Sequence, residues 1–315
     1  MNVFSHKAMD TDFTVRFSSG DERFFASAAN ACFDRIDALE ARLSRFRDDS
    51  DVAAIRALRP GEVATVAPET MDVLLASAEV CAATRGAFDP TVGRAMDVVR
   101  DAVAASAGDA RREDLSKLLE RGGLSRLVLD PEHLRLTVKP RADGAPDESL
   151  SLDFGGVGKG YALDECAKIL KGEQYELDDF LLDAGGSTVL ACGPGPDGDG
   201  WKLGVGGRWR DRASKVSGSV RLRDFALSGS GFEVQGAHII DTRQHARAGR
   251  WAQSWAVASS GAVADALTTA SLAMSAAEIR TACEELHAGV MVAREQPRAF
   301  DRLRSPLVVL GDWPA

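Results

Sequence analysis

The sequence predicts an α+β protein in which mixed and antiparallel sheets are flanked by helices, arranged as two closely joined lobes. Two kinds of apolar spacing support this class. Some segments have apolar residues at every third or fourth position, which is typical of amphipathic helices, and others alternate apolar with polar residues, which is typical of strands. No internal repeat and no long linker divides the chain, so we expect one domain over residues 1–315.

The first part of the chain is predicted to form a strand followed by two helices. Residues 12–17 alternate polar and apolar side chains, as in a half-buried strand. From Phe25 to about Phe46 the apolar residues fall at helical spacing. Pro68 suits the first turn of a second helix, because its missing amide proton is not needed there, and that helix should end before Gly86.

The remaining elements follow from turn residues and apolar runs. Further helices are expected over residues 112–120 and 160–170, from about residue 261, and after a capping box of Ser275 and Glu278. Strands are expected over residues 127–129, 134–138, 150–154, 180–183, 201–205, 217–222, 290–293 and 306–310. Exposed loops are expected over residues 141–149 and 193–200.

The charge of the chain argues against nucleic acid as a generic partner. Lys and Arg number 38 and Asp and Glu 47, which gives a formal charge of −9, and polyanions bind poorly to such a surface. The five cysteines lie far apart, so neither a disulfide framework nor a zinc cluster is predicted. No apolar stretch suits a transmembrane helix, and no secretory signal precedes the first strand. We therefore expect a soluble protein, cytoplasmic as given or periplasmic if a leader has been removed.

The densest chemical signal lies in residues 152–162, where four glycines and Lys159 stand between a predicted strand and a predicted helix. Glycines let main-chain groups approach a ligand closely, and the N-terminus of a helix favours negative charge. Lys159 adds a cation that can neutralise a phosphate. The segment is therefore a candidate pyrophosphate site. A tight structural turn is the alternative, because neither a Walker sequence nor GxGxxG spacing is present.

A carboxylate and a hydroxyl, those of Asp265 and Thr269, are four residues apart and so share one face of a predicted helix. Hard oxygen ligands of this kind suit magnesium, which usually keeps water and phosphate oxygens in its other positions. In the alternative interpretation Asp265 caps the helix and Thr269 bonds to the backbone. Spacing alone favours neither.

Two further segments carry candidate residues. His238 enters an apolar strand and can act as a base near neutral pH, although a structural histidine is the commoner case. In residues 86–93 a helix stop is followed by an aromatic residue, an acid and a proline. This segment is either a rigid loop that carries a ligand contact or only a well-made turn.

Together these segments resemble the ApbE family, the FAD:protein FMN transferases. Residues 86–93 are similar to the family's G-x-F-D-P-T-V-G segment, and residues 153–162 to its D-x-G-G-x-x-K-G-Y-A segment. The other matches follow in family order: Met9-Asp10-Thr11, residues 43–50, Asp183 to Gly186, Ser228-Gly229, His238 to Asp241 and Ala264 to Thr269. The combination covers nearly the whole chain.

The resemblance implies an ApbE-like α+β fold and a magnesium-dependent enzyme. Such an enzyme cleaves the pyrophosphate of FAD and moves FMN onto a threonine or serine of a target flavoprotein, releasing AMP. Asp265, Thr269 and the main chain of Gly156 match the family's metal ligands, and His238 matches the histidine that helps to deprotonate the acceptor. The positions that match contacts to FAD are Lys159, Met9, Phe46, Arg47, Asp48, Ala87, Phe88, Asp89 and Ile239.

Two other functions stay open. With water in place of the acceptor hydroxyl the protein would be an FAD pyrophosphatase that gives FMN and AMP, and without catalysis it would be an FAD-binding protein. The sequence also departs from the family at Asp10, where a glycine is usual, and after Asp241, where a proline is common. Neither departure removes Asp265 or Thr269.

Overall fold

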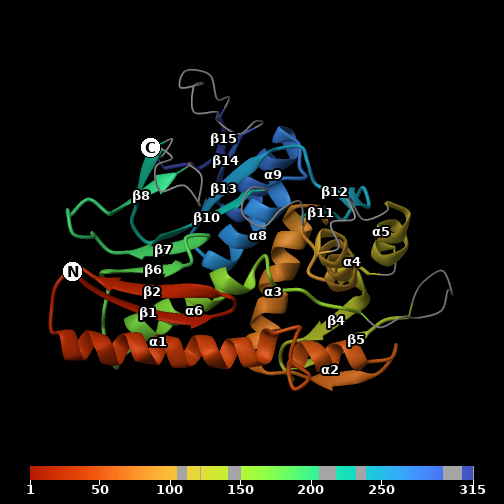
Figure 1. Cartoon of the computed structure of the whole chain (residues 1–315), viewed down its shortest axis with the longest axis horizontal. Helices are drawn as coiled ribbons and strands as arrows, with labels where there is room; N and C mark the ends of the chain where they lie inside the picture. The colour runs from red at the N-terminus through yellow and green to blue at the C-terminus, as the bar shows by residue number, and fades with distance from the viewer. Residues whose placement is uncertain are drawn as a thin grey trace.

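The computed structural model describes residues 1–104, 112–120, 122–140, 150–205, 218–231, 239–293 and 307–314, and its centre is an eight-stranded sheet (Figure 1). Neighbouring strands of this sheet are antiparallel throughout. Their order is β1 (Asn2–Ala8), β2 (Thr11–Phe17), β6 (Phe180–Ala184), β7 (Thr188–Cys192), β10 (Phe225–Gly231), β13 (Gln253–Ala258), β14 (Gly289–Ala293) and β15 (Leu307–Gly311).

The central sheet is covered on both faces. Successive side chains of a strand point to opposite sides, so each strand contributes to both layers. Leu182 of β6 belongs to the main hydrophobic core, whereas Leu181 belongs to a second cluster. The helices on the main core side are α1 (Glu22–Leu43), α6 (Gly158–Lys171) and α8 (Gly261–Ser271), with α3 (Pro68–Ala83) and α9 (Ala276–Leu286) against α8 or its neighbours (Figure 1). The second cluster includes residues of the paired strands β8 (Trp201–Val205) and β9 (Gly218–Leu222).

A further group of elements lies at one end of the molecule (Figure 1). Its members are α2 (Asp51–Ala57), β3 (Val63–Thr65), α4 (Gly93–Ala104), α5 (Arg112–Leu119), a short 3-10 helix (Leu124–Arg126), β4 (Leu127–Asp130), β5 (Arg135–Val138), β11 (Ile240–Asp241) and β12 (Ala246–Arg247). Leu136 of β5 joins the main core, whereas Val99 of α4 and Leu115 of α5 form a small cluster with Ile240. The division of one domain into two lobes stays a prediction.

Capping residues explain where several helices begin. The Asp21 carboxylate accepts a hydrogen bond from the Phe24 amide at 2.8 Å at the start of α1. Pro68 occupies the first turn of α3, as predicted. The predicted capping box of α9 is confirmed, because the side chains of Ser275 and Glu278 each accept a hydrogen bond from the other residue's main-chain amide.

The predicted strand at residues 150–154 is wrong. Ser151 forms only an isolated bridge with Val92, and the Asp153 amide donates to the Pro90 carbonyl at 2.7 Å. The segment is therefore paired with the loop that precedes α4 and not with a sheet. Its apolar run, which resembles a strand in the sequence, is buried because Leu150 and Leu152 pack into the main core.

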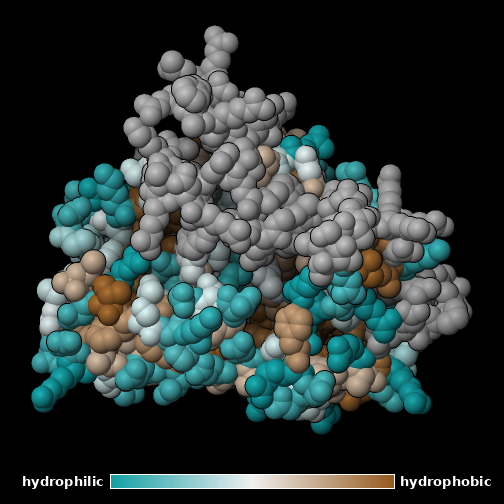
Figure 2. Space-filling view, in the orientation of Figure 1, coloured by the Kyte–Doolittle hydropathy of each residue, from teal (hydrophilic) through white to brown (hydrophobic). Residues whose placement is uncertain are grey.

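The surface shown in Figure 2 is mostly hydrophilic where the described residues form it, with hydrophobic residues in separate groups. Among the described helices, none has both the length and the apolar character needed to span a membrane.

Candidate active site

Asp265 and Thr269 share one face of α8, as their spacing predicts, and this helix packs on β10 and β13. The Asp265 side chain is buried, with 4% of the residue exposed. Its Oδ1 accepts a hydrogen bond from the Ser228 hydroxyl at 3.3 Å, and its Oδ2 accepts one from the Gly160 amide at 3.2 Å. The Thr269 hydroxyl donates to the Asp265 carbonyl at 3.2 Å. The Asp265 carboxylate is thus held from β10 and from α6, whereas Thr269 makes the backbone bond of the alternative interpretation.

The position of α8 depends on a second carboxylate, that of Asp164 on α6. This carboxylate accepts hydrogen bonds from the Ser260 hydroxyl at 2.7 Å, the Gly261 amide at 2.6 Å and the Ala262 amide at 3.0 Å. An acceptor at this point satisfies amides that the first turn of a helix leaves free. Burial raises the pKa of Asp164, while the three donors oppose that shift.

The glycine turn before α6 lies directly against Thr269. A Cβ atom built on Gly156 would be 3.3 Å from Thr269 Oγ1 and 3.5 Å from a ring carbon of Phe88. Glycine thus lets the turn approach the helix closely. The ammonium group of Lys159 donates to the Gly155 carbonyl at 3.0 Å and ties the turn to the first turn of α6.

The donor set at Asp265 fits a divalent cation. A buried carboxylate is costly unless a cation or several donors balance its charge, and the described residues offer Asp265 two neutral donors and no ion pair. The described residues also hold no group of three or more His, Cys, Asp or Glu that could bind a metal. A cation here would therefore need the Thr269 hydroxyl and main-chain oxygen such as that of Gly156, which suits magnesium better than zinc.

Arg45 connects the first part of α4 to Asp153, just before the glycine turn. Its guanidinium group donates to the Asp153 carboxylate at 2.7 Å, to the Gly93 carbonyl at 2.9 Å and to Asp97. The side chains of Arg45 and Asp153 are only 9% and 8% exposed. This ion pair is therefore largely shielded from water, and it holds the residue from which the glycine turn begins.

The predicted FAD contact Phe46 is 74% exposed. The guanidinium carbons of Arg45 and Arg100 lie 5.4 Å and 5.0 Å from its ring centroid, within cation–π range. Arg47 and Asp48 follow it at the surface. The contacts recorded for Phe46 thus connect it to α4 and not to α8.

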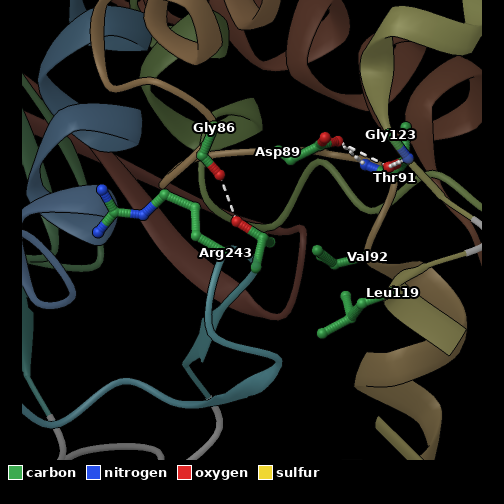
Figure 3. A pocket seen from close by; sticks show the side chains of 8 residues that line it. Gly86, Asp89, Thr91, Val92, Leu119, Gly123 and Arg243 are labelled. Atoms are coloured by element: carbon green, nitrogen blue, oxygen red, sulfur yellow. Dashed lines mark hydrogen bonds between the residues drawn. The ribbon is translucent and has the colours of Figure 1, made fainter. Parts of the chain in front are cut away.

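The loop at residues 86–93 is held by internal hydrogen bonds, which both interpretations of its sequence allow. Ala87 and Phe88 are buried. The Asp89 carboxylate accepts hydrogen bonds from the Thr91 amide at 2.8 Å, from the Thr91 hydroxyl at 2.7 Å and from the Leu124 amide at 3.0 Å. Asp89 therefore shapes the loop, and Figure 3 shows its side chain beside Thr91 and directed toward Gly123.

A cavity of about 210 Å³ lies beside this loop. Its lining residues are Gly86, Asp89, Thr91, Val92, Leu119, Gly123, Thr242 and Arg243. The Arg243 guanidinium group points away from Asp89 (Figure 3) and pairs with Glu278 at 2.7 Å. The cavity shares Asp89 with the predicted FAD contacts but includes none of the candidate metal ligands.

The β1–β2 turn explains why Asp10 is compatible with a position where the family usually has glycine. Met9 and Asp10 have φ values of 49° and 58°, and Ala8 pairs with Thr11 across the turn. Two successive left-handed residues form the tight turn that suits a hairpin, and aspartate tolerates this conformation better than most residues. Met9 packs against the main core, and Asp10 is exposed.

His238 lies outside the described residues, whereas Ile239 after it is buried. The segment without the family's proline is held by Asp241, which is 3% exposed. Its Oδ1 accepts hydrogen bonds from the Arg243 amide at 3.0 Å and the Gln244 amide at 3.3 Å. These bonds form the turn without a proline.

A sequence model of the ApbE family matches residues 9–293. The chain belongs to the ApbE family. It is 26% identical over 250 residues to the FAD:protein FMN transferase of Klebsiella pneumoniae, which covers 76% of this chain and 68% of that protein. Among solved structures it is similar to the Pseudomonas stutzeri flavinyl transferase ApbE, with a TM-score of 0.77, 22% identity and coverage of 98% and 93%. It is also similar to the Thermotoga maritima ApbE protein, with a TM-score of 0.73 and 25% identity, over 93% of this chain and 94% of that one. The α+β fold is thereby confirmed.

In this ApbE-family chain, the structure brings together four predicted residues from three segments: Gly156, Asp265, Thr269 and Phe88. Sequence patterns missed the residues that place them. Asp164 is an ordinary charged helix residue in the sequence, and Arg45 lies in the matched segment 43–50 but was not singled out. Ser228 had a detectable signal, since the alternation of Leu227, Ser228 and Gly229 puts its hydroxyl on the opposite face from Leu227.

Proposed function

We propose that this ApbE-family protein is an FAD:protein FMN transferase that needs magnesium, moves FMN from FAD to a threonine or serine of a flavoprotein, and releases AMP. The observation that carries the proposal is the contact between the Asp265–Thr269 face of α8 and the Gly156 turn. The names of the curated relatives support the same activity.

The residues that would hold Mg²⁺ are Asp265 through its carboxylate, Thr269 through its hydroxyl and Gly156 through its main-chain oxygen. When bound, the ion supplies positive charge to the pyrophosphate oxygens as a Lewis acid. The protein's own task is then to position a phosphoanhydride that is already activated. The buried setting of Asp265 keeps its carboxylate directed by Ser228 and Gly160 and away from competing water.

Lys159 and the first turn of α6 would bind the phosphates. The ammonium group already lies at the turn, 3.0 Å from the Gly155 carbonyl, and α6 presents its N-terminus to the same place. The remaining proposed FAD contacts are Met9, Phe46, Arg47, Asp48, Ala87, Phe88, Asp89 and Ile239. Asp89 would act mainly by shaping its loop, because its oxygens already accept three hydrogen bonds.

We assign His238 as the base that takes the proton from the acceptor hydroxyl. A base must be able to form a hydrogen bond to that hydroxyl. It also needs a pKa near neutrality, which is typical of histidine side chains. Replacement of His238 by alanine should slow transfer while FAD binding persists. A transfer rate equal to that of the wild type would remove His238 from this role.

One experiment separates transfer from hydrolysis. The full chain is incubated with FAD, Mg²⁺ and a candidate flavoprotein domain, and the domain is measured by intact-protein mass spectrometry. A covalent FMN adduct supports transfer, whereas AMP released at an equal rate without the domain supports a pyrophosphatase.

A second experiment tests the metal role against a protein that only binds FAD. The variant Asp265→Ala should lose turnover while FAD binding falls less. Ser271→Ala is a matched control, because its hydroxyl is buried on the same helix but donates to the Leu267 carbonyl at 2.7 Å. Unchanged AMP release from Asp265→Ala would contradict the proposal.

A further inference from the structure

Two hydroxyl groups connect the central sheet to the Asp265 carboxylate. Thr188 of β7 and Ser228 of β10 lie directly opposite each other in the sheet. Their hydroxyl oxygens are 3.0 Å apart, and Ser228 Oγ lies 3.3 Å from Asp265 Oδ1. Thr188 and Ser228 are both fully buried. The three side chains therefore form a continuous polar path beneath α8.

The direction of these hydrogen bonds follows from the available protons. Each hydroxyl has one proton to donate. The Ser187 carbonyl and the Asp265 carboxylate beside Ser228 can only accept, so Ser228 directs its proton to one of them and accepts a hydrogen bond from Thr188. The Ser228 proton is then free for an acceptor, and its two candidates are Asp265 Oδ1 and the Ser187 carbonyl at 3.1 Å.

The ionised carboxylate is the better of the two acceptors. Hydrogen bonds to charged groups are stronger than those between neutral groups, and the bond that Ser228 receives from Thr188 polarises its own proton further. Asp265 Oδ1 would otherwise have no donor among the described residues. The other oxygen, Oδ2, accepts from the Gly160 amide of α6.

From this geometry we propose that Ser228 is a positioning residue that orients the Asp265 carboxylate toward the metal ion. This inference rests on the metal site of the proposed function. One donor on each carboxylate oxygen, from two different elements, fixes the plane of the group and leaves lone pairs for a cation. Partners of this kind tune the affinity of metal ligands in proteins.

The surroundings of this path support a positioning role. Four neighbouring positions of α8 are apolar and fully buried: Ala264, Ala266, Leu267 and Ala270. The buried hydroxyls of Thr268 and Ser271 on the same helix donate to main-chain carbonyls. Burying a hydroxyl costs free energy that a hydrogen bond offsets, so a serine here gives no packing advantage over alanine. Ser228 therefore contributes through the hydrogen bond that it donates to the Asp265 carboxylate.

The test measures metal binding and not activity. Mn²⁺ is titrated into the full chain without nucleotide, and the free ion is followed by electron paramagnetic resonance. Ser228→Ala should raise the Kd for Mn²⁺ by roughly 10- to 100-fold, the range typical of lost partners of a metal ligand. Ser228→Thr, which keeps the hydroxyl, should bind Mn²⁺ nearly as the wild type does.

Two controls separate positioning from general loss of packing. Ser271→Ala removes another buried hydroxyl from the same region and should leave the Kd unchanged. Thr188→Val removes the donor to Ser228 but keeps the Ser228 proton, so its effect should be smaller than that of Ser228→Ala. This variant also tests the path if Ser228→Ala does not fold, since an unchanged Kd for Thr188→Val would then overturn the inference.

The outcomes distinguish this inference from the proposed function. If Asp265→Ala abolishes Mn²⁺ binding and Ser228→Ala does not weaken it, Ser228 has no positioning role and the metal site stands. An equal loss in Ser271→Ala would also overturn the role of Ser228. If the wild type binds no Mn²⁺, both the metal site and the inference are overturned.

Discussion

The backbones of Gly160 in α6 and Gly261 in α8 are in direct contact. A Cβ atom on Gly160 would lie 2.0 Å from the Gly261 carbonyl oxygen, and one on Gly261 would lie 2.5 Å from the Gly160 carbonyl oxygen. No side chain can occupy these distances. Because the Gly160 amide also bonds to Asp265, this contact sets the spacing between the glycine turn and the helix that carries the candidate metal ligands.

Gly160→Ala should therefore separate α6 from α8. We expect a loss of about 1–3 kcal/mol in the free energy of unfolding, as for other overpacked cores, together with weaker metal binding. Denaturant unfolding and Mn²⁺ titration measure the two effects. Gly158→Ala is the control, because its Cβ would meet only Phe154 Cβ, at an ordinary 3.7 Å. Equal stability of the two variants would contradict the prediction.

Asp164→Ala should weaken the start of α8. The variant leaves the amides of Gly261 and Ala262 without their acceptor, and loss of such a cap costs about 1–2 kcal/mol. Thermal unfolding measures this loss. Asp21→Ala removes the cap of α1 instead and should also reduce stability. Only Asp164→Ala should also weaken Mn²⁺ binding. The same Kd for Mn²⁺ in both variants would show that the start of α8 does not affect the metal site.

Arg45→Ala should destabilise the base of the glycine turn. Breaking a buried ion pair costs about 3–5 kcal/mol, and we expect the lower end because Arg100 still lies 3.6 Å from Asp153. Arg47→Ala breaks only the exposed pair with Asp49 at 2.9 Å and should cost much less stability, because solvent screens this pair. Chemical denaturation compares the two arginine variants, and similar losses would show that the Arg45 pair is not specially stabilising.

Glu278 should make stability depend on pH in the acid range. The main-chain amide of Ser275, the Ser275 hydroxyl and Arg243 lower the pKa of this carboxyl from 4.5 to about 2. The folded state therefore binds the Glu278 proton more weakly than the unfolded state. Its contribution is fully present above pH 4.5 and is lost as pH falls toward 2.

Glu278→Gln removes this titration. Unfolding measured between pH 2 and 4.5 should show a shallower pH dependence for the variant than for the wild type. Both proteins should approach the same stability at the acid end, where the wild-type carboxyl is protonated. Parallel pH profiles over this range would contradict the assignment.

Local patterns in the sequence were enough for several elements and for the placement of Asp265 and Thr269 on one helix face. Helical spacing predicted α1, and the capping box predicted the start of α9. The four-residue interval placed Asp265 and Thr269 on one face of α8. These features depend on residues close together in the chain, where backbone periodicity decides which side chains are neighbours.

Contacts between distant segments followed from packing alone. An apolar run at residues 150–154 has the same composition whether it enters a sheet or lies beside a loop. Here the Pro90 carbonyl accepts a hydrogen bond from this segment, and Val92 forms a β-bridge with it. The placement of Ser228 beneath Asp265 depends on the strand order β7-β10-β13 and on the close approach of α6 to α8. Chain spacing carries no information about such pairings, because they arise only when separate elements bury their apolar faces against one another.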